Sequence, residues 1–385
     1  MKNKKGFWQG ALIGALAVLL VLGLVSCGIN VGGNAVSKKT ETKIWLIEKL
    51  IQKCYAGEVD EEVLEEGIIK GYVSGLEDPY STYYTKEETK NLFESVQGEF
   101  IGVGAVLTQD PDTGVVTILQ VYDESPAMKA GVKDEDILYK VDDKEVTGVD
   151  LNEVVRWIKG EENTEVKLTV IRDDKELDMT AVRAEIEVIS VEYKMLESGI
   201  GYIAVSEFQD TTYDQYKTAL EELEKQGMKS LIVDLRNNPG GSLDTVCKMA
   251  DLMLPEGLIV YTEDKAGNRE EHKSDEKNQF TKPLVVMING NSASASEIFS
   301  GAIQDHETGT ILGTQSFGKG KVQQIFDLKD GTSLKLTVSK YFTPDGRDID
   351  GEGITPDVEI KYEADEKNPD ADNQLEEAIR ILKNR

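Results

Sequence analysis

The chain has 385 residues, a length sufficient for two or three domains with packed cores. Its 43 lysine and arginine residues are outnumbered by 71 aspartate and glutamate residues, giving a net charge of −28 and a pI near 4.5. So acidic a chain has no basic stripe to neutralise phosphates, which argues against nucleic-acid binding. The sequence offers no cluster of metal-ligating residues, and we expect neither a metal ion nor a cofactor.

Residues 1–28 have the charge order of a secretory signal or a signal anchor. Three lysines, Lys2, Lys4 and Lys5, precede the apolar run Ala11–Val25. That run is short for a spanning helix, although Phe7–Val25 approaches the required ~20 residues. The sequence LVSC also resembles a bacterial lipobox, in which Cys27 is lipidated. A retained anchor, a lipoprotein and a removed signal remain open, and each predicts an extracytoplasmic protein at the bacterial cell surface or in the periplasm.

Residues 29–97 are predicted to form a linker and a helical region. Small polar residues over Ile29–Lys39 precede a helical pattern in which Ile44, Ile47, Ile51 and Cys54 share one face. Glu61–Ser74 continues with the same period, and Pro79 then breaks the helix. Because Cys54 and Cys247 both lie in apolar helical patterns, we expect two buried free thiols rather than a disulfide.

Residues 98–184 alternate short strand patterns with turns and one helix. Gly102, Val103, Gly104 and Ala105 stand where a PDZ domain has its carboxylate-binding loop, and SPAMKAGVKDEDIL (Ser125–Leu138) resembles the PDZ motif that follows. Successive N–H groups there would bind a peptide's terminal carboxylate, with Asn152–Lys159 as the helix flanking the groove. The PDZ region could bind the C-terminal tails of substrates, or it could mainly regulate the access of substrates to the protease. Arg172 ends the last strand pattern, either as a coupling residue or as a surface cation.

From residue 185 to residue 362, strand and helix patterns alternate, which predicts an α/β core. The expected elements are Ile200–Val205, Tyr213–Lys225, Ser230–Leu235, Ser242–Leu254, Leu284–Ile288, Ser294–Gln304, Thr310–Gly313 and Leu334–Phe342. Residues 363–385 are an acidic connector, Glu363–Asp372, followed by a short helix at Leu375–Lys383.

A serine stands at a predicted helix N-terminus inside this core. Ser294 and Glu297 have capping-box spacing, and the free N–H groups there could stabilise an oxyanion beside a serine nucleophile. The only histidines are His272, in a charged loop pattern, and His306, beyond the helix. Lys319 is the alternative base, provided that burial lowers its pKa by several units.

Three motifs together resemble the C-terminal processing (tail-specific) peptidases, which are serine peptidases with a PDZ domain and a Ser-Lys dyad. They are LRNNPGG (Leu235–Gly241), SASASE around Ser294, and FGKGKVQ around Lys319. The resemblance covers about Glu41–Ile360. It implies that Ser294 is the nucleophile, Lys319 the general base and Gln323 the partner that orients the amine.

The same resemblance implies a crotonase-like protease core, an inserted PDZ domain and an amino-terminal helical region that in some members mediates dimer contacts, so a homodimer is possible. It places the oxyanion hole at Gly240 or Gly241 together with Ala295. The substrates would be proteins with accessible apolar C-termini.

Two alternatives belong to other classes. Trypsin-like PDZ proteases need GNSGG and an upstream histidine, whereas this chain has GNSAS and its PDZ region precedes the serine. A non-catalytic PDZ scaffold or chaperone would not need Ser294, Lys319 and Gln323 together.

Overall fold

The computed structural model describes residues 36–277, 279–364, 367–368 and 371–384. The predicted signal or anchor segment, including Cys27, lies outside these residues. Among the residues that are described, no helix is both long and apolar enough to span a membrane. The chain divides into two compact units, Met1–Gly67 and Ile68–Arg385.

Helix α2 (Lys38–Cys54) accounts for most of what is described in the first unit. The Ser37 side chain accepts a hydrogen bond from Thr40 N and so begins the helix. None of its residues is buried, and its exposed side chains include Trp45, Leu46, Ile47 and Leu50. The prediction of a buried thiol is therefore wrong for Cys54, which is free and exposed, whereas Cys247 is free and buried. Helix α3 (Glu61–Ser74) has the predicted bounds.

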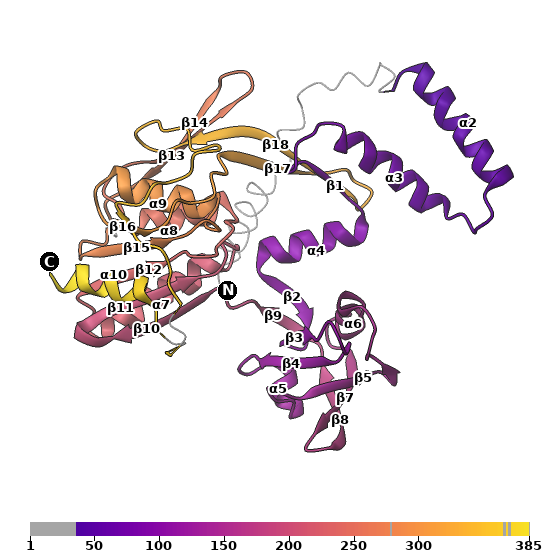
Figure 1. Cartoon of the computed structure of the whole chain (residues 1–385), viewed down its shortest axis with the longest axis horizontal. Helices are drawn as coiled ribbons and strands as arrows, with labels where there is room; N and C mark the ends of the chain where they lie inside the picture. The colour runs from indigo at the N-terminus through magenta and orange to yellow at the C-terminus, as the bar shows by residue number, and fades with distance from the viewer. Residues whose placement is uncertain (1–35, 278, 365–366, 369–370, 385) are drawn as a thin grey trace, which may run out of the picture. The chain divides into compact units, whose positions relative to one another are not determined.

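The largest core of the second unit is built on a six-stranded sheet of order β10-β11-β12-β15-β16-β19 (Figure 1). Its strands are β10 (Val191–Leu196), β11 (Ile200–Val205), β12 (Ser230–Asp234), β15 (Leu284–Ile288), β16 (Thr310–Gly313) and β19 (Val358–Glu359). All neighbouring pairs are parallel except β10 with β11. β11, β15 and β16 have the bounds that the sequence predicted.

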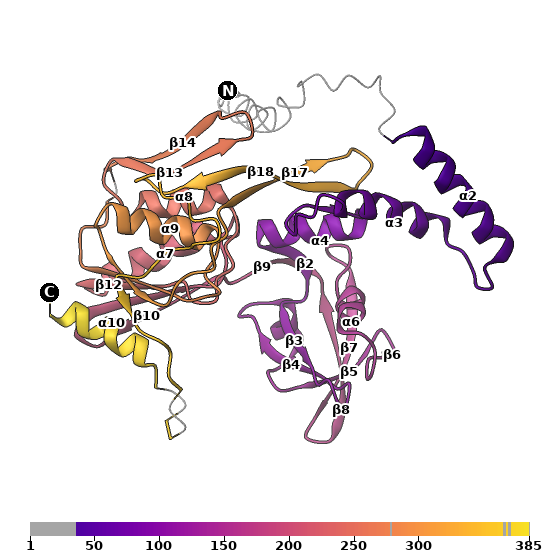
Figure 2. The ribbon, with the colours of Figure 1, turned by 45° about the horizontal axis from the view of Figure 1, so that its top comes forward.

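Helices cover both faces of this sheet, which explains why β12 and β15 are buried at every position. Leu231, Val233 and Val286 belong to the core shared with α7 (Thr212–Lys225), α8 (Leu243–Asp251) and α9 (Ala295–Asp305). Ile232 and Val285 belong to the opposite core, with α10 (Asn373–Lys383). Figure 2 shows α8 and α9 on one side of the sheet and α10 on the other.

A second sheet has the order β1-β18-β13-β14, with β17 also paired to β18. Its strands are β1 (Thr82–Tyr84), β13 (Gly257–Asp264), β14 (Arg269–Ser274), β17 (Lys321–Asp327) and β18 (Ser333–Phe342). His272 therefore lies in strand β14, paired with Val260, and not in the predicted loop. Helix α4 (Lys86–Gln97), capped by Thr85 and Glu88, leads from β1 to the next segment.

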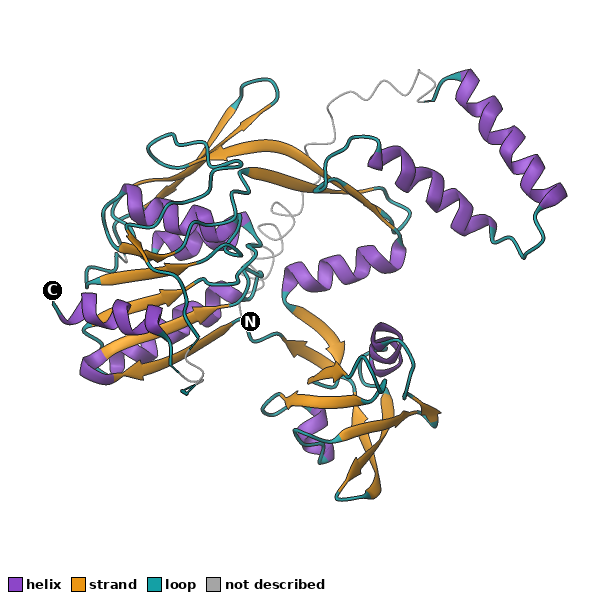
Figure 3. Cartoon of the chain, viewed as in Figure 1, coloured by secondary structure: helices purple, strands orange, loops and turns teal. Residues whose placement is uncertain are grey.

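The segment 99–187 is rich in strands, as Figure 3 shows, and has its own core around Val116, Leu138 and Val170. Its strands are β2 (Glu99–Gly102), β3 (Ala105–Gln109), β4 (Val116–Val121), β5 (Ile137–Val141), β6 (Lys144–Glu145), β7 (Glu165–Arg172), β8 (Lys175–Val182) and β9 (Ala184–Glu187). It holds two helices rather than the one predicted, α5 (Pro126–Ala130) and α6 (Leu151–Ile158). Arg172 is paired within this segment, since its guanidinium donates to both oxygens of the buried Asp136 carboxylate.

Candidate active site

Ser294 lies between strand β15 and helix α9, at the carboxyl end of the parallel sheet. Ligands of open α/β sheets commonly bind at this edge. Its backbone has φ 54° and ψ −112°, a conformation that costs a residue with a side chain on the order of 1–3 kcal/mol. Strained backbone of this kind clusters at functional sites, and it presents Ser294 at the free N-terminus of α9.

The neighbouring serines are already used in structural hydrogen bonds. Ser292 Oγ donates to Leu235 O at 2.7 Å, and Ser296 Oγ donates to Asn238 O at 3.0 Å. Both side chains are fully buried. Of the three serines in the SASAS stretch, Ser294 is therefore the one that lines a cavity.

The Glu297 carboxylate connects the Ser294 segment with the Lys319 segment. One oxygen accepts from Ser294 N at 2.8 Å and from Lys319 N at 2.9 Å. The other accepts from Ser316 Oγ and Gly318 N, both at 2.6 Å. Glu297 is fully buried, and its charge is stabilised by these four donors. A single side chain thus fixes the backbone of both candidate catalytic residues.

Tyr341 provides a second connection between the same two residues. Its hydroxyl lies within hydrogen-bonding reach of Ser294 O, at 3.1 Å, and of Lys319 O. The ring is buried, and burial raises the pKa of the phenol well above its usual value. The hydroxyl therefore stays protonated and remains a donor to these carbonyls.

The Lys319 side chain is partly withdrawn from solvent. Burial lowers the pKa of its ammonium, and the nearby Lys335 ammonium lowers it further, while the carboxylates of Glu297 and Asp78 act in the opposite direction. Lys319 Nζ lies 4.7 Å from the ring centroid of Tyr80. Among the described residues, Nζ has no hydrogen-bond or ion-pair partner. These surroundings favour the neutral amine that a general base requires.

Glycines allow both backbone segments to approach closely. Gly318 has φ 86°, and a Cβ at Gly320 would lie 2.6 Å from Asp350 N. A Cβ at Gly240, where φ is 110°, would lie 2.8 Å from Ser294 Cβ. The glycine-rich loop is therefore in direct contact with the candidate nucleophile.

The structure distinguishes the two glycines that could donate to an oxyanion. Gly240 N already donates to Asn238 Oδ1 at 2.8 Å. Among the described residues, neither Gly241 N nor Ala295 N has an acceptor. Gly241 and Ala295 thus retain the free N–H groups, whereas the choice of Gly240 as donor is not supported by this geometry.

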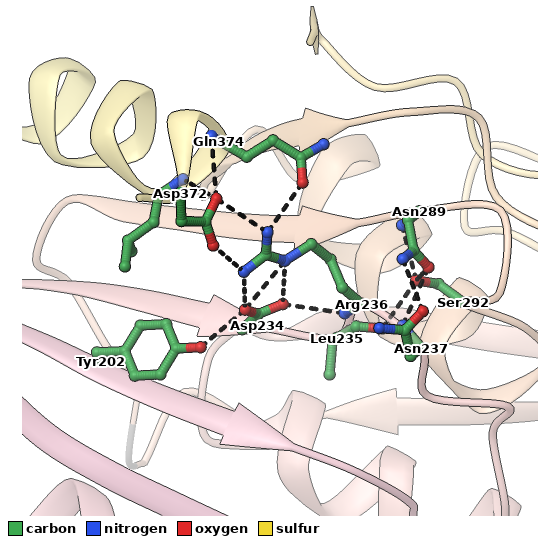
Figure 4. Close-up of polar contacts among 10 residues, drawn as sticks. Tyr202, Asp234, Leu235, Arg236, Asn237, Asn289, Ser292, Asp372 and Gln374 are labelled. Atoms are coloured by element: carbon green, nitrogen blue, oxygen red, sulfur yellow. Dashed lines mark hydrogen bonds and ion pairs between the residues drawn. The ribbon is translucent and has the colours of Figure 1, made fainter. Parts of the chain in front are cut away.

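A polar network holds the glycine-rich loop from its other side (Figure 4). The Arg236 guanidinium donates to Asp234 Oδ2 at 2.6 Å and to Asp372 Oδ2 at 2.7 Å, which ties the loop to the start of α10. Asn289 Oδ1 accepts from Asn237 N at 3.0 Å. These contacts fix the path of the chain into Gly240 and Gly241.

The candidate residues line one cavity of about 370 Å³. Its lining residues come from α4, the loop after β11, the glycine-rich loop and the start of α8, the Ser294 turn and α9, and the β17–β18 hairpin with the residue before it: Leu92, Ser95, Val96, Glu207, Phe208, Pro239, Gly240, Gly241, Ser242, Leu243, Ser294, Ala295, Ile298, Lys319, Lys321, Val322, Gln323, Ile325, Lys335 and Tyr341. The cavity therefore brings together a hydroxyl, an amine and two free backbone N–H groups.

Three other residues considered from the sequence lie elsewhere or make other contacts. Gln323 lines the cavity, but its amide donates to Lys321 O and Thr337 Oγ1, and no contact joins it to Lys319 Nζ among the described residues. His306 caps the far end of α9, and its Nε2 lies 2.7 Å from Leu258 O. His272 lies in the β13–β14 pair. No histidine is placed beside Ser294.

The strand-rich segment has a groove of its own, of about 100 Å³. It is lined by Phe100, Gly102, Val103, Gly104, Ala105, Leu107, Ile118, Leu138, Val155, Ile158, Lys159 and Leu168. Strand β3 is an edge strand of its sheet, so its outer side can pair with a peptide. Neither Val103 N nor Gly104 N donates to another described residue. The predicted carboxylate loop thus has free donors beside an open strand edge.

Helix α4 contacts both the cavity and this groove. Leu92, Ser95 and Val96 line the cavity. On the same helix, Glu94 accepts from Lys159 Nζ at 2.6 Å, and Lys159 lines the groove. The two sites therefore share one structural element.

Family models match three segments of the chain. Residues 199–360 match peptidase family S41, residues 117–172 match the PDZ domain, and residues 30–89 match the "Activating protease CtpB N-terminal domain". A protein of Staphylococcus aureus (strain COL), described as "Probable CtpA-like serine protease", is 38% identical over 369 residues, covering 93% of this chain and 74% of that protein. A protein of Staphylococcus haemolyticus (strain JCSC1435) with the same description is 39% identical over 362 residues, covering 92% of this chain and 72% of that protein.

Two solved structures share the arrangement of elements. The photosystem II D1 C-terminal processing protease is 28% identical, with a TM-score of 0.50 over 88% of this chain and 90% of that one. The protein described as "Putative S41 protease from Bacteroides fragilis NCTC 9343" is 16% identical, with a TM-score of 0.52 over 88% of this chain and 97% of that one. This identity shows a likeness of fold alone.

Proposed function

The chain belongs to peptidase family S41, the C-terminal processing serine peptidases, and on that premise we propose that Ser294 and Lys319 are its catalytic dyad. The observation that carries this proposal is the Glu297 carboxylate, which accepts hydrogen bonds from the backbone of both residues. Because both side chains line one cavity, a serine hydroxyl and a partly desolvated amine face the same substrate.

In this mechanism the neutral Lys319 amine takes the proton of Ser294 Oγ as the oxygen attacks the scissile carbonyl carbon. The N–H groups of Gly241 and Ala295 donate to the oxyanion that forms. The Lys319 ammonium then gives its proton to the leaving amine, which leaves an acyl-enzyme on Ser294. A water molecule, deprotonated by Lys319, attacks the ester carbonyl, and the Lys319 ammonium returns this proton to Ser294 Oγ as the second product leaves. Gln323 supports Lys319 indirectly, through the backbone of Lys321.

The pH dependence of kcat/KM distinguishes a lysine base from a histidine base. The base acts when neutral, so kcat/KM is expected to rise with pH through the lowered pKa of Lys319 and to be greatest on the neutral to alkaline side. His306→Ala is expected to keep most of the activity, because His306 contacts Leu258 O at the far end of α9. The measurement is a kcat/KM profile for wild type and His306→Ala. Loss of activity in folded His306→Ala, with Lys319→Met still active, would return the chain to the histidine-dependent proteases.

We propose that the groove beside β3 binds the C-terminal tail of a protein substrate through the N–H groups of Val103 and Gly104. Hydrogen bonds to a charged group contribute ~1.5–3 kcal/mol, so a substrate with a free apolar C-terminus is expected to be cut about 10-fold faster than its amidated form. A tail peptide added in excess should also change cleavage of a short substrate, because Lys159 connects the groove to α4. Equal rates for the free and amidated substrates would confine the PDZ domain to a structural or gating role.

We also propose that residues 1–28 hold the peptidase at the membrane with its catalytic part outside the cytoplasm. The three lysines before Ala11–Val25 support this location, and cell fractionation of the full chain beside a form beginning at Gly33 checks it. The exposed apolar side chains of α2 support a homodimer, whose mass sedimentation analysis would measure.

A further inference from the structure

The charge inside the active-site cavity is opposite to that of the chain. Besides the base Lys319, whose amine is neutral in the proposed mechanism, two lining residues are lysines, Lys321 and Lys335, and a single lining residue, Glu207, is a carboxylic acid. Burial raises the pKa of Glu207 above its usual value. The chain as a whole has a net charge of −28. A cationic cavity in so acidic a protein indicates a local requirement for an anionic group.

Lys335 is the cavity lysine to which the catalytic mechanism gives no role. It is half-buried, and among the described residues its ammonium forms no ion pair or hydrogen bond; its Nζ lies 5.3 Å from the ring centroid of Tyr84. Lys321 Nζ lies 4.0 Å from Asp350 Oδ2, and its charge also acts on the nearby Asp78 carboxylate. A partly desolvated ammonium is stabilised by a nearby anion. No carboxylate of the described residues pairs with Lys335, so a bound substrate could supply the anion.

The hairpin geometry places Lys335 on the face that also carries Gln323 and Ile325. Lys335 on β18 pairs with Ile325 on β17, and Thr337 pairs with Gln323. Because side chains two residues apart lie on the same face of a strand, Gln323, Ile325 and Lys335 form one face of the hairpin. These three residues also line the cavity that contains Ser294. An extended substrate lying along this face would pass Lys335 as it reaches Ser294.

We propose that Lys335, assisted by Lys321, binds a carboxylate of the substrate close to the scissile peptide bond. This inference rests on the proposed function of the cavity and adds a substrate class to it. The carboxylate can be the side chain of a glutamate or aspartate next to the cleavage site, or the α-carboxylate of a short tail. Both sources offer an anionic acceptor for the same ammonium donors.

Two matched peptide series distinguish these sources. In the first, a glutamate at each position near the cleavage site is compared with glutamine, in peptides with a remote, amidated end. In the second, a cleavage site a few residues from a free C-terminus is compared with its amide. Wild type, Lys335→Met and Lys329→Met are measured at one pH. Lys329 is the matched control, because it lies on the hairpin turn, is exposed and pairs with Asp327.

Wild type and Lys329→Met are expected to prefer the carboxylate in one series by about 10-fold in kcat/KM, and Lys335→Met is expected to lose most of that preference. Each ratio compares two peptides cut by the same base, so any change in the pKa of Lys319 cancels. A preference for a free C-terminus that arises from the PDZ groove would persist in Lys335→Met. Only a preference that arises from Lys335 would be lost in that variant. The absence of preference in wild type, or an unchanged preference in Lys335→Met, overturns the proposal.

Binding measurements separate this inference from the catalytic proposal. Fluorescence anisotropy of the same peptides is measured with Ser294→Ala and with Ser294→Ala combined with Lys335→Met. If wild type cuts no peptide while the carboxylate preference in binding is lost with Lys335, the dyad assignment fails and the carboxylate site stands. If wild type cuts peptides and binding shows no preference, the carboxylate site fails and the peptidase stands.

Discussion

Ser294→Ala and Lys319→Met are each expected to lower kcat by on the order of 10⁴-fold or more, because one removes the nucleophile and the other removes the base. The two losses should not add in the double variant, since the residues act as a unit. The measurement is hydrolysis of a denatured protein with an apolar tail by the form beginning at Gly33.

The folded state of both variants should persist. Lys319→Met exchanges a partly desolvated amine for an apolar side chain of similar length, so its melting temperature is expected to equal or exceed that of wild type. Lys329→Met serves again as the matched control and should retain full activity. Activity that survives in Ser294→Ala, where Ser292 and Ser296 are intact, would show that Ser294 is not the nucleophile.

Glu297→Gln is expected to combine a large loss of activity with a large loss of stability. The carboxylate accepts from four donors, and a glutamine amide nitrogen would face two of them with N–H groups of its own. Unsatisfied buried donors cost ~1–3 kcal/mol each, so the free energy of unfolding should fall by several kcal/mol. We expect kcat to fall about 100-fold or more, because Ser294 and Lys319 are no longer held in place.

Denaturant unfolding and steady-state kinetics of Glu297→Gln measure the two effects. Glu307→Gln is the control, since Glu307 follows the same helix but is exposed. A Glu297→Gln variant with wild-type kcat and lower stability would restrict Glu297 to a folding role.

The strands and the position of Ser294 could be predicted because their signals are local. The apolar runs Leu284–Ile288 and Thr310–Gly313 are short, lie between turns and became β15 and β16 with the same bounds. The capping-box spacing of Ser294 and Glu297 also predicted the start of α9, which depends only on residues three apart.

The rest of the site depends on contacts distant in sequence. Capping-box spacing predicts one of the four hydrogen bonds of Glu297; the other three come from residues 19 to 22 positions further along the chain. Tyr341 reaches Ser294 across 47 positions. Gly240 and Gly241 look equivalent in the sequence, and only the Asn238 side chain separates their roles.

The predicted burial of Cys54 and the predicted contact of Gln323 with Lys319 both differ from the structure, and each difference has a physical reason. The helical pattern around Cys54 is real, but α2 buries none of its residues, so the thiol is exposed. Gln323 follows an irregularity in the pairing of β17 with β18, and its amide contacts Thr337 instead of Lys319. A strand pattern in sequence does not reveal such a shift of register.

The backbone at Ser294 also restricts which nucleophiles could have evolved at this position. Its φ of 54° is tolerated by glycine and only at some cost by a small unbranched residue. Threonine carries the same hydroxyl group, but its branched Cβ makes a positive φ much less accessible. Ser294→Thr is therefore expected to be inactive although it keeps a hydroxyl group. The branched Cβ of threonine would force the main chain out of the conformation that presents the hydroxyl.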